Sequence, residues 1–188
     1  MRHIFFVTAA LWLAAAVAHD APTVIDRSGV GSASGSSAAV PQLAGRLPQA
    51  DLIVVHKGER RLYLMQHGQV LRSYHIALGL MPEGPKERAG DFRTPEGHYQ
   101  LERRNPRSDY FLSVQVSYPN DDDRRRAHHN GWDPGGSIMI HGLPNMLRHP
   151  PDYYATRDWT DGCIALSNSD MVELWLLTAD NTPIEIAP

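Results

Sequence analysis

Short stretches in which apolar and polar residues alternate run through much of this 188-residue chain. At 112–118, Leu, Val, Val and Tyr occupy every second position, with Ser, Gln and Ser between them. This period of two is typical of a strand that buries one face of a sheet. Other short apolar or alternating runs predict further strands at 52–55, 62–65, 69–77, 99–101, 136–141 and 184–186.

Only one helix is predicted, close to the C-terminus. Met171, Leu174, Trp175 and Thr178 follow the 3.6-residue spacing of one helical face, and residues 167–169 offer N-cap side chains. Many strands with a single helix indicate a mainly-β domain. We expect a β-sandwich or a partly closed barrel with this helix packed on it.

The first 18 residues have the pattern of a secretory signal peptide. Arg2 and His3 precede an apolar run at 4–17, and Ala-Val-Ala at 16–18 fits a small-x-small cleavage site. The run is shorter than the ~20 residues that span a bilayer comfortably, and an uncleaved anchor is the alternative. We therefore expect export to the periplasm or cell envelope, with no membrane span after cleavage.

Residues 19–50 are rich in Ala, Gly, Ser and Pro and lack hydrophobic periodicity, which predicts a flexible linker. This leaves 51–188 for one folded domain. Hydrophobic residues make up 42% of the chain and charged residues 21%, with a net charge of −3. The composition argues against a disordered chain, and the near-neutral charge gives no support for a nucleic-acid partner. The sequence does not indicate the oligomeric state.

Cys163 is the only cysteine, so no disulfide can form within the chain. In an exported protein a leftover cysteine suggests an intermolecular bridge or a reactive thiol. The alternative is an inert cysteine that packs as a small hydrophobe. Gly162 precedes it, and a glycine there lets backbone N–H groups converge on a developing oxyanion. A nucleophilic cysteine also needs a base, and a histidine that is close in space is expected.

His141 is the strongest candidate for that base among the ten histidines. It ends the apolar run at 136–141 and is followed by Gly142, so its ring can project from a rigid edge into a site. It precedes Cys163 by 22 residues. The sequence therefore predicts a cysteine–histidine pair that is assembled by the fold.

A long irregular stretch is 119–136, which contains three Asp followed by three Arg. It is interpreted either as a solvated charged connector or as a lid or substrate wall. A metallohydrolase is the alternative to thiol chemistry, although no zinc motif fits the spacing. Its candidate ligands are His128, His129, Asp133, His141 and His149.

Two motifs together resemble a known family. His141-Gly142 followed by Thr160-x-Gly162-Cys163 resembles the signature of the L,D-transpeptidase catalytic domain, the YkuD domain of bacterial cell walls. Gly-Asp-x-x-Thr-Pro-Glu-Gly at 90–97 is similar to the family's upstream strand and turn. The resemblance covers 51–188 and implies the family's β-sandwich or partly closed barrel.

The resemblance also implies a mechanism. Cys163 attacks the peptide carbonyl between an L-centre and a D-centre of a peptidoglycan stem peptide. His141 acts as general acid and base, and the Gly142 carbonyl orients it. The backbone N–H groups of Asp161, Gly162 and Cys163 form the oxyanion hole. An amine of a second stem peptide, or water, then releases the acyl group from the thioester. The resemblance also implies that carbapenems acylate the cysteine. It implies neither a metal nor an organic cofactor.

One position departs from the family pattern. Ala165 stands where many members have arginine, and the surrounding run resembles a subgroup without it, which includes enzymes that release wall-linked proteins. We expect an L,D-transpeptidase that crosslinks or remodels the cell wall and so affects cell shape. The alternatives are an L,D-specific hydrolase that trims stems or releases a wall-linked protein, and a non-catalytic wall-binding module. The candidate substrate contacts are Tyr118, Trp132, Arg148, Trp159 and Thr160.

Overall fold

The computed structural model describes residues 47–188. The predicted signal peptide and residues 19–46 of the predicted linker lie outside the described residues. Ala50, which the composition assigned to the linker, is buried, and its N–H donates to the Leu177 carbonyl (2.7 Å). The fold therefore begins at least one residue before position 51.

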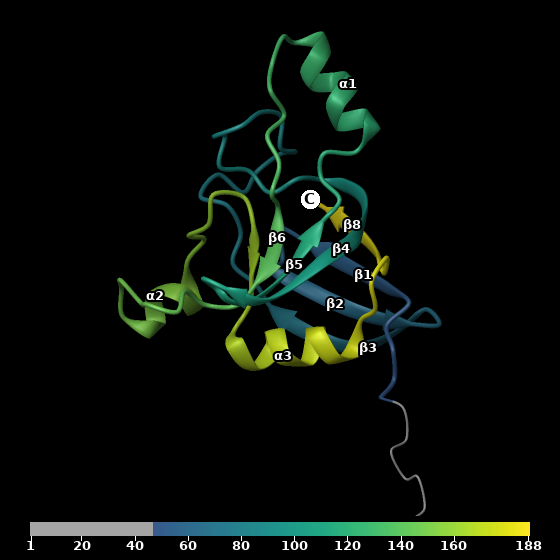
Figure 1. Ribbon diagram of the computed structural model, residues 1–188, viewed down its shortest axis with the longest axis vertical. Helices are drawn as coiled ribbons and strands as arrows, with labels where there is room; N and C mark the ends of the chain where they lie inside the picture. Colours follow the sequence, from purple (N-terminus) through teal and green to yellow (C-terminus); the bar gives the residue numbers. More distant parts are fainter. Residues whose placement is uncertain (1–46) are drawn as a thin grey trace, which may run out of the picture. The chain divides into compact units, whose positions relative to one another are not determined.

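Eight strands form one sheet, in the order β3-β2-β1-β8-β4-β5-β6-β7 (Figure 1). Burial alternates along β1, β2 and β8, so each of these strands has one buried face. The strands are β1 (Leu52–His56), β2 (Arg61–Gln66), β3 (Gln69–His75), β4 (Gly97–Ser108), β5 (Phe111–Val116), β6 (Met139–His141), β7 (Ile164–Ala165) and β8 (Pro183–Ala187).

The long strand β4 connects the two halves of the sheet. Its residues 97–100 pair with β8, which runs parallel to β1, and its residues 101–108 pair with β5. Beyond β5, β6 pairs antiparallel and β7 pairs parallel to β6. Figure 1 shows the β1–β3 meander on one side of β4 and the short strand β6 on the other.

The sheet is not closed into a barrel. Its edge strands are β3 and β7, and only isolated bridges link them, from the segment after β3 to the segment around β7. These bridges join Ala77 to Ala165 and Gly79 to Thr160. The predicted mainly-β architecture is confirmed, and the bridges hold the segment on either side of Cys163 against residues 77–79.

The structure contains three helices between residues 47 and 188, so the prediction of a single helix is wrong. They are α1 (Asp121–His129), α2 (Pro151–Thr156) and α3 (Asn168–Leu177). The predicted helix near the C-terminus is α3, whose side chains Met171, Leu174 and Leu177 enter the core beneath the strands. No helix in this described part is both long and apolar enough to cross a membrane.

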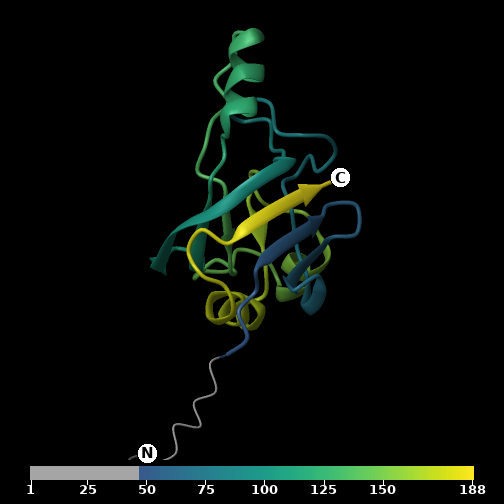
Figure 2. The ribbon, with the colours of Figure 1, turned by 90° about the vertical axis from the view of Figure 1, so that its right-hand side faces the viewer.

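Helix α1 occupies half of the stretch 119–136, which was interpreted as a charged connector or as a lid. Asn120 caps it, and the Asp123 side chain accepts from the Asn120 N–H in return. Three acidic residues stand in its first turn and basic residues in its last, which suits the helix dipole. Hydrophobic periodicity could not reveal it, because only Asp123 and Ala127 are buried. Figures 1 and 2 show α1 standing clear of the sheet.

Candidate active site

Three neighbouring strands bring Cys163 and His141 together. His141 ends β6 and pairs with Ser113 of β5 on one side and with Ala165 of β7 on the other. Cys163 comes directly before β7 and lies two positions from Ala165, so both share a face of the strand. Cys163 and His141 are therefore diagonal neighbours on one face of the sheet, and both line one pocket.

The His141 ring is held by a hydrogen bond between Nδ1 and the Gly142 carbonyl oxygen (2.7 Å). A carbonyl only accepts, so the proton of the neutral ring resides on Nδ1 and Nε2 keeps a free lone pair. The residue is 4% exposed. Burial lowers the pKa of His141 to about 4, against the opposing effect of the Gly142 carbonyl. The ring is therefore neutral at pH 7.

The backbone after His141 is fixed by its surroundings. The Gly142 N–H donates to the carbonyls of Tyr110 and Leu112 (both 3.1 Å), and the Leu143 N–H donates to Asn168 Oδ1 (2.8 Å). A Cβ atom at position 142 would lie 2.6 Å from Asn168 Oδ1. Glycine is thus required for the close approach that aims the carbonyl at the ring.

The Cys163 thiol has two polar neighbours. The Met139 N–H donates to Sγ (3.4 Å), and Sγ approaches the Ser137 carbonyl oxygen at 3.7 Å. Burial raises the pKa of the Cys163 thiol, partly offset by the Met139 N–H. Across residues 47–188, no hydrogen bond joins Sγ to the His141 ring. At rest the pair is a neutral thiol beside a neutral imidazole.

A tight turn precedes the thiol. Thr160 Oγ1 accepts from the Gly162 N–H (3.1 Å) and donates to the Cys163 carbonyl (2.7 Å). Gly162 has φ of +129°, and a Cβ there would lie 2.6 Å from the Arg93 carbonyl oxygen. The Gly162 N–H already has this acceptor, whereas the N–H groups of Asp161 and Cys163 make no hydrogen bond to any described residue.

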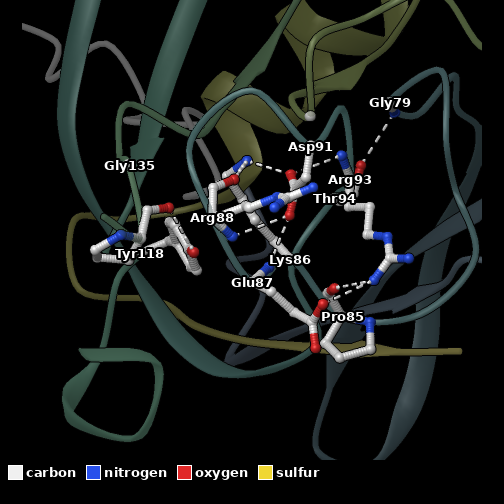
Figure 3. Close-up of polar contacts among 12 residues, drawn as sticks. Gly79, Pro85, Lys86, Glu87, Arg88, Asp91, Arg93, Thr94, Tyr118 and Gly135 are labelled. Carbon is white, nitrogen blue, oxygen red and sulfur yellow. Dashed lines mark hydrogen bonds and ion pairs between the residues drawn. The ribbon is translucent and has the colours of Figure 1, made fainter. Parts of the chain in front are cut away.

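Asp91, from the second motif, is the centre of a hydrogen-bond network (Figure 3). Its carboxylate accepts from Lys86 Nζ (2.7 Å) and from the backbone N–H groups of Glu87, Arg88 and Arg93. The Lys86 and Asp91 side chains are only 4% and 8% exposed. Burial alone would raise the pKa of Asp91, but these donors together hold it below its ordinary value.

The same motif contacts the turn directly. Thr94 Oγ1 accepts from the Gly79 N–H (3.1 Å), and Gly79 forms a bridge with Thr160. The Arg93 carbonyl closes against Gly162, as described above. The Asp91 network therefore fixes a segment, 86–94, that packs against the residues just before the thiol.

The pocket around Cys163 and His141 has a volume of about 360 Å³. Two aromatic rings flank the histidine, with centroids 4.6 Å (Tyr110) and 5.6 Å (Trp159) from its own. Of the predicted substrate contacts, the structure brings Trp159 and Thr160 to this pocket. The wall also includes residues that the sequence did not indicate: Asn105, Ser108, Asp109, Tyr110, Ser113, Ser137 and Met139.

The other predicted contacts lie elsewhere. Tyr118 is buried and its hydroxyl donates to the Pro134 carbonyl (2.9 Å), so it is a core residue and not a pocket residue. Trp132 lies beneath the Arg88 guanidinium, 5.5 Å from it, and does not line the pocket. Arg148 lines a neighbouring cavity.

The metal-site alternative finds no support in the arrangement of ligands. Within residues 47–188, no three His, Cys, Asp or Glu side chains form a group that could hold a metal ion. The histidines of the proposed set belong to α1, β6 and the segment before α2.

Comparisons with known proteins agree with the geometry. The model of the L,D-transpeptidase catalytic domain (YkuD) matches residues 50–186. YafK of Escherichia coli strain K12 is 33% identical over 129 residues, which cover 65% of this chain and 45% of YafK. The structure of Pgp2 from Campylobacter jejuni, a helical cell shape determining protein, is 29% identical, with a TM-score of 0.52. That match covers 72% of this chain and 46% of Pgp2, so the chain spans about half the length of these relatives.

Proposed function

Because this chain belongs to the YkuD family of L,D-transpeptidase catalytic domains, we propose that it is an exported enzyme that acylates Cys163 with a peptidoglycan stem peptide. The observation that carries the proposal is the shared pocket of Cys163 and a buried His141 whose proton is fixed on Nδ1. The predicted signal peptide supports action in the periplasm or cell envelope. The name of Pgp2 supports a role in cell shape.

The first half-reaction forms a thioester. Sγ of Cys163 attacks the carbonyl carbon of the peptide bond between an L-centre and a D-centre, and its proton passes to Nε2 of His141. The tetrahedral intermediate then collapses, the C–N bond breaks, and the leaving amine takes the proton from Nε2. His141 ends this step neutral, as it began.

The second half-reaction releases the acyl group. The amine of another stem attacks the thioester carbonyl, His141 Nε2 takes its proton, and the C–S bond breaks to return the protonated thiol. The product is a crosslinked stem. Water in place of the amine gives a trimmed stem or a released wall-linked protein, which is the hydrolytic alternative. Neither route requires a cofactor.

The developing oxyanion needs hydrogen-bond donors that are not already engaged. The N–H groups of Asp161 and Cys163 meet this requirement best, because the Gly162 N–H donates to Thr160 Oγ1. We therefore assign the oxyanion hole to Asp161 and Cys163, with Gly162 contributing the turn that aims them. Thr160 supports this turn through both of its hydrogen bonds.

The test is acylation followed by intact-mass spectrometry. Wild-type protein incubated with a carbapenem is expected to gain the mass of one adduct, and Cys163→Ala is expected to gain none. An adduct of equal yield on Cys163→Ala would refute the assignment of the nucleophile. The protein is then incubated with a purified donor stem peptide and an amine acceptor. Crosslinked products indicate transfer, and trimmed products indicate hydrolysis.

A further inference from the structure

Two peptide units follow the His141 ring along the chain, and different parts of the fold hold them. The first unit joins His141 to Gly142. Its carbonyl accepts from the Leu166 N–H (2.9 Å), and its N–H donates to the carbonyls of Tyr110 and Leu112. Backbone groups of neighbouring segments therefore fix this first unit.

The second unit joins Gly142 to Leu143, and a side chain holds each of its ends. Its carbonyl oxygen accepts from His141 Nδ1 (2.7 Å), and its N–H donates to Asn168 Oδ1 (2.8 Å). Across residues 47–188, neither the Leu143 N–H nor the Asn168 side chain makes another hydrogen bond. A peptide unit is planar, so an acceptor that fixes the direction of its N–H also fixes the direction of its carbonyl. Asn168 therefore determines where the Gly142 carbonyl points.

The packing around Gly142 leaves room only for this contact. Asn168 is the first residue of α3, and its Oδ1 would lie 2.6 Å from a Cβ atom at position 142. Phe111 closes the other side, with its own Cβ at 3.0 Å from that position. Gly142 does not have a positive φ, so its backbone conformation alone does not demand glycine. Glycine is needed at position 142 because Asn168 and Phe111 occupy the space of a side chain.

The contact also affects the strength of the hydrogen bond that holds the histidine ring. The Leu143 N–H and the Gly142 carbonyl belong to one amide group, and successive hydrogen bonds along such a chain polarise one another. Donation to Asn168 thus makes the Gly142 carbonyl a stronger acceptor for the Nδ1 proton. Neutral histidine in water favours the proton on Nε2, so the Nδ1–H form requires an acceptor of this kind.

We propose that Asn168 is a positioning residue for His141, because it orients and polarises the carbonyl that keeps the ring proton on Nδ1. This inference rests on the proposed function, since the ring needs a free lone pair on Nε2 only if it acts as the base. Asn168 does not line the catalytic pocket, so it acts through the Gly142–Leu143 amide and not on the substrate. The hydrogen-bond chain behind the thiol then consists of the imidazole, this amide and the Asn168 carboxamide.

Nitrogen-15 NMR of the histidine rings tests the inference without turnover. Spectra of the histidine-labelled protein at pH 7 distinguish Nδ1–H from Nε2–H, and His141→Gln identifies the signals of His141 by their loss. We expect wild-type His141 to be protonated on Nδ1 and Asn168→Ala to shift the population toward Nε2–H. Carbapenem acylation of Asn168→Ala should be about tenfold slower, as the loss of one hydrogen bond predicts. Asn168 is exposed and alanine favours a helix, so this variant should fold.

Two further variants separate positioning from the stability of α3. Asn168→Asp keeps an acceptor for the Leu143 N–H, so it should restore both the Nδ1–H form and the acylation rate. Ser167 caps α3 by accepting from the Asp170 N–H (3.1 Å) and makes no hydrogen bond to the Gly142–Leu143 amide. Ser167→Ala should therefore weaken the start of the helix but keep the wild-type tautomer and rate.

The inference is overturned if Asn168→Ala keeps the wild-type tautomer or the wild-type rate. It is also overturned if Asn168→Asp fails to restore them, or if Ser167→Ala changes them as much as Asn168→Ala does. Failure of the wild-type protein to form a thioester with any donor would instead refute the proposed function, and the tautomer measurement does not depend on that outcome.

Discussion

Replacing Asp91 with asparagine removes the counter-charge of a buried lysine. Lys86 Nζ donates to Asp91 Oδ1 (2.7 Å) and to the Arg88 carbonyl (3.1 Å), and its side chain is only 4% exposed. Asparagine keeps the size of the side chain but carries no charge. Its amide nitrogen would face N–H donors where the second carboxylate oxygen now accepts from Glu87 and Arg88.

The cost follows from these contacts. Removing one partner of a buried ion pair destabilises proteins by about 3–5 kcal/mol, since the remaining charge stays buried without compensation. We therefore expect Asp91→Asn to lower the free energy of unfolding by about 3 kcal/mol or more at pH 7. The turn before Cys163 should also loosen, because segment 86–94 packs against Gly162 through the Arg93 carbonyl.

The pH dependence gives this prediction a second, independent readout. The folded protein holds the pKa of Asp91 below its ordinary value, so its stabilising effect is complete above about pH 4, the ordinary value for aspartate. This effect is lost as the pH falls through the lowered folded-state pKa. The difference in stability between wild type and Asp91→Asn should therefore shrink in acid.

Urea unfolding followed by tryptophan fluorescence at pH 7 and at acid pH measures both effects. Glu87→Gln is the matched control, because its ion pair with Arg93 (3.3 Å) belongs to the same segment but is about one-third exposed. Such pairs contribute about 0–1 kcal/mol. A free energy of unfolding for Asp91→Asn within 1 kcal/mol of wild type, or a loss of stability that does not diminish in acid, would contradict the prediction.

Three further outcomes are expected. His141→Gln should slow carbapenem acylation about 10²–10⁴-fold without unfolding the protein, and an unchanged acylation rate would exclude it as the base. Gly162→Ala should lower the free energy of unfolding by more than the ~1–2 kcal/mol of left-handed backbone strain, because its Cβ meets the Arg93 carbonyl. In Gly68→Ala the added Cβ has open space around it, so this variant shows the strain alone. Alkylation of Cys163 by iodoacetamide in the unliganded protein should rise only above the ordinary pH range of thiols, since burial raises its pKa; full reactivity at pH 7 would contradict this.

Local patterns predicted the elements whose burial is regular. The strict alternation at 112–116 became β5, and the helical spacing around Met171 and Leu174 became α3. Helix α1 was missed because its stability comes from capping and from ion pairs between residues three apart, including Asp121 with Arg124 (3.1 Å). Such a helix has no apolar stripe to detect.

The sequence could predict a site residue only where a glycine that the local backbone needs stands next to it. Gly142 and Gly162 marked His141 and Cys163, and a Cβ atom at either position would clash with a neighbouring oxygen. Tyr110 was missed because it comes from the β4–β5 turn and reaches the histidine only once β6 has paired with β5. Tyr118 was predicted to be a substrate contact, but its side chain completes the core.

The resting charges of Cys163 and His141 suit the export that residues 1–18 predict, because an exported thiol meets an oxidising compartment. Oxidants and disulfides react with thiolates, and the raised pKa of Cys163 keeps its sulfur protonated at neutral pH. A histidine with an ordinary pKa could become charged and stabilise the thiolate, but burial lowers the pKa of His141 to about 4 and prevents this. Under the proposed mechanism, the nucleophile is therefore generated only when a bound carbonyl makes proton transfer to Nε2 favourable. Protection of the thiol and its proposed use in catalysis both follow from the burial of the same pocket.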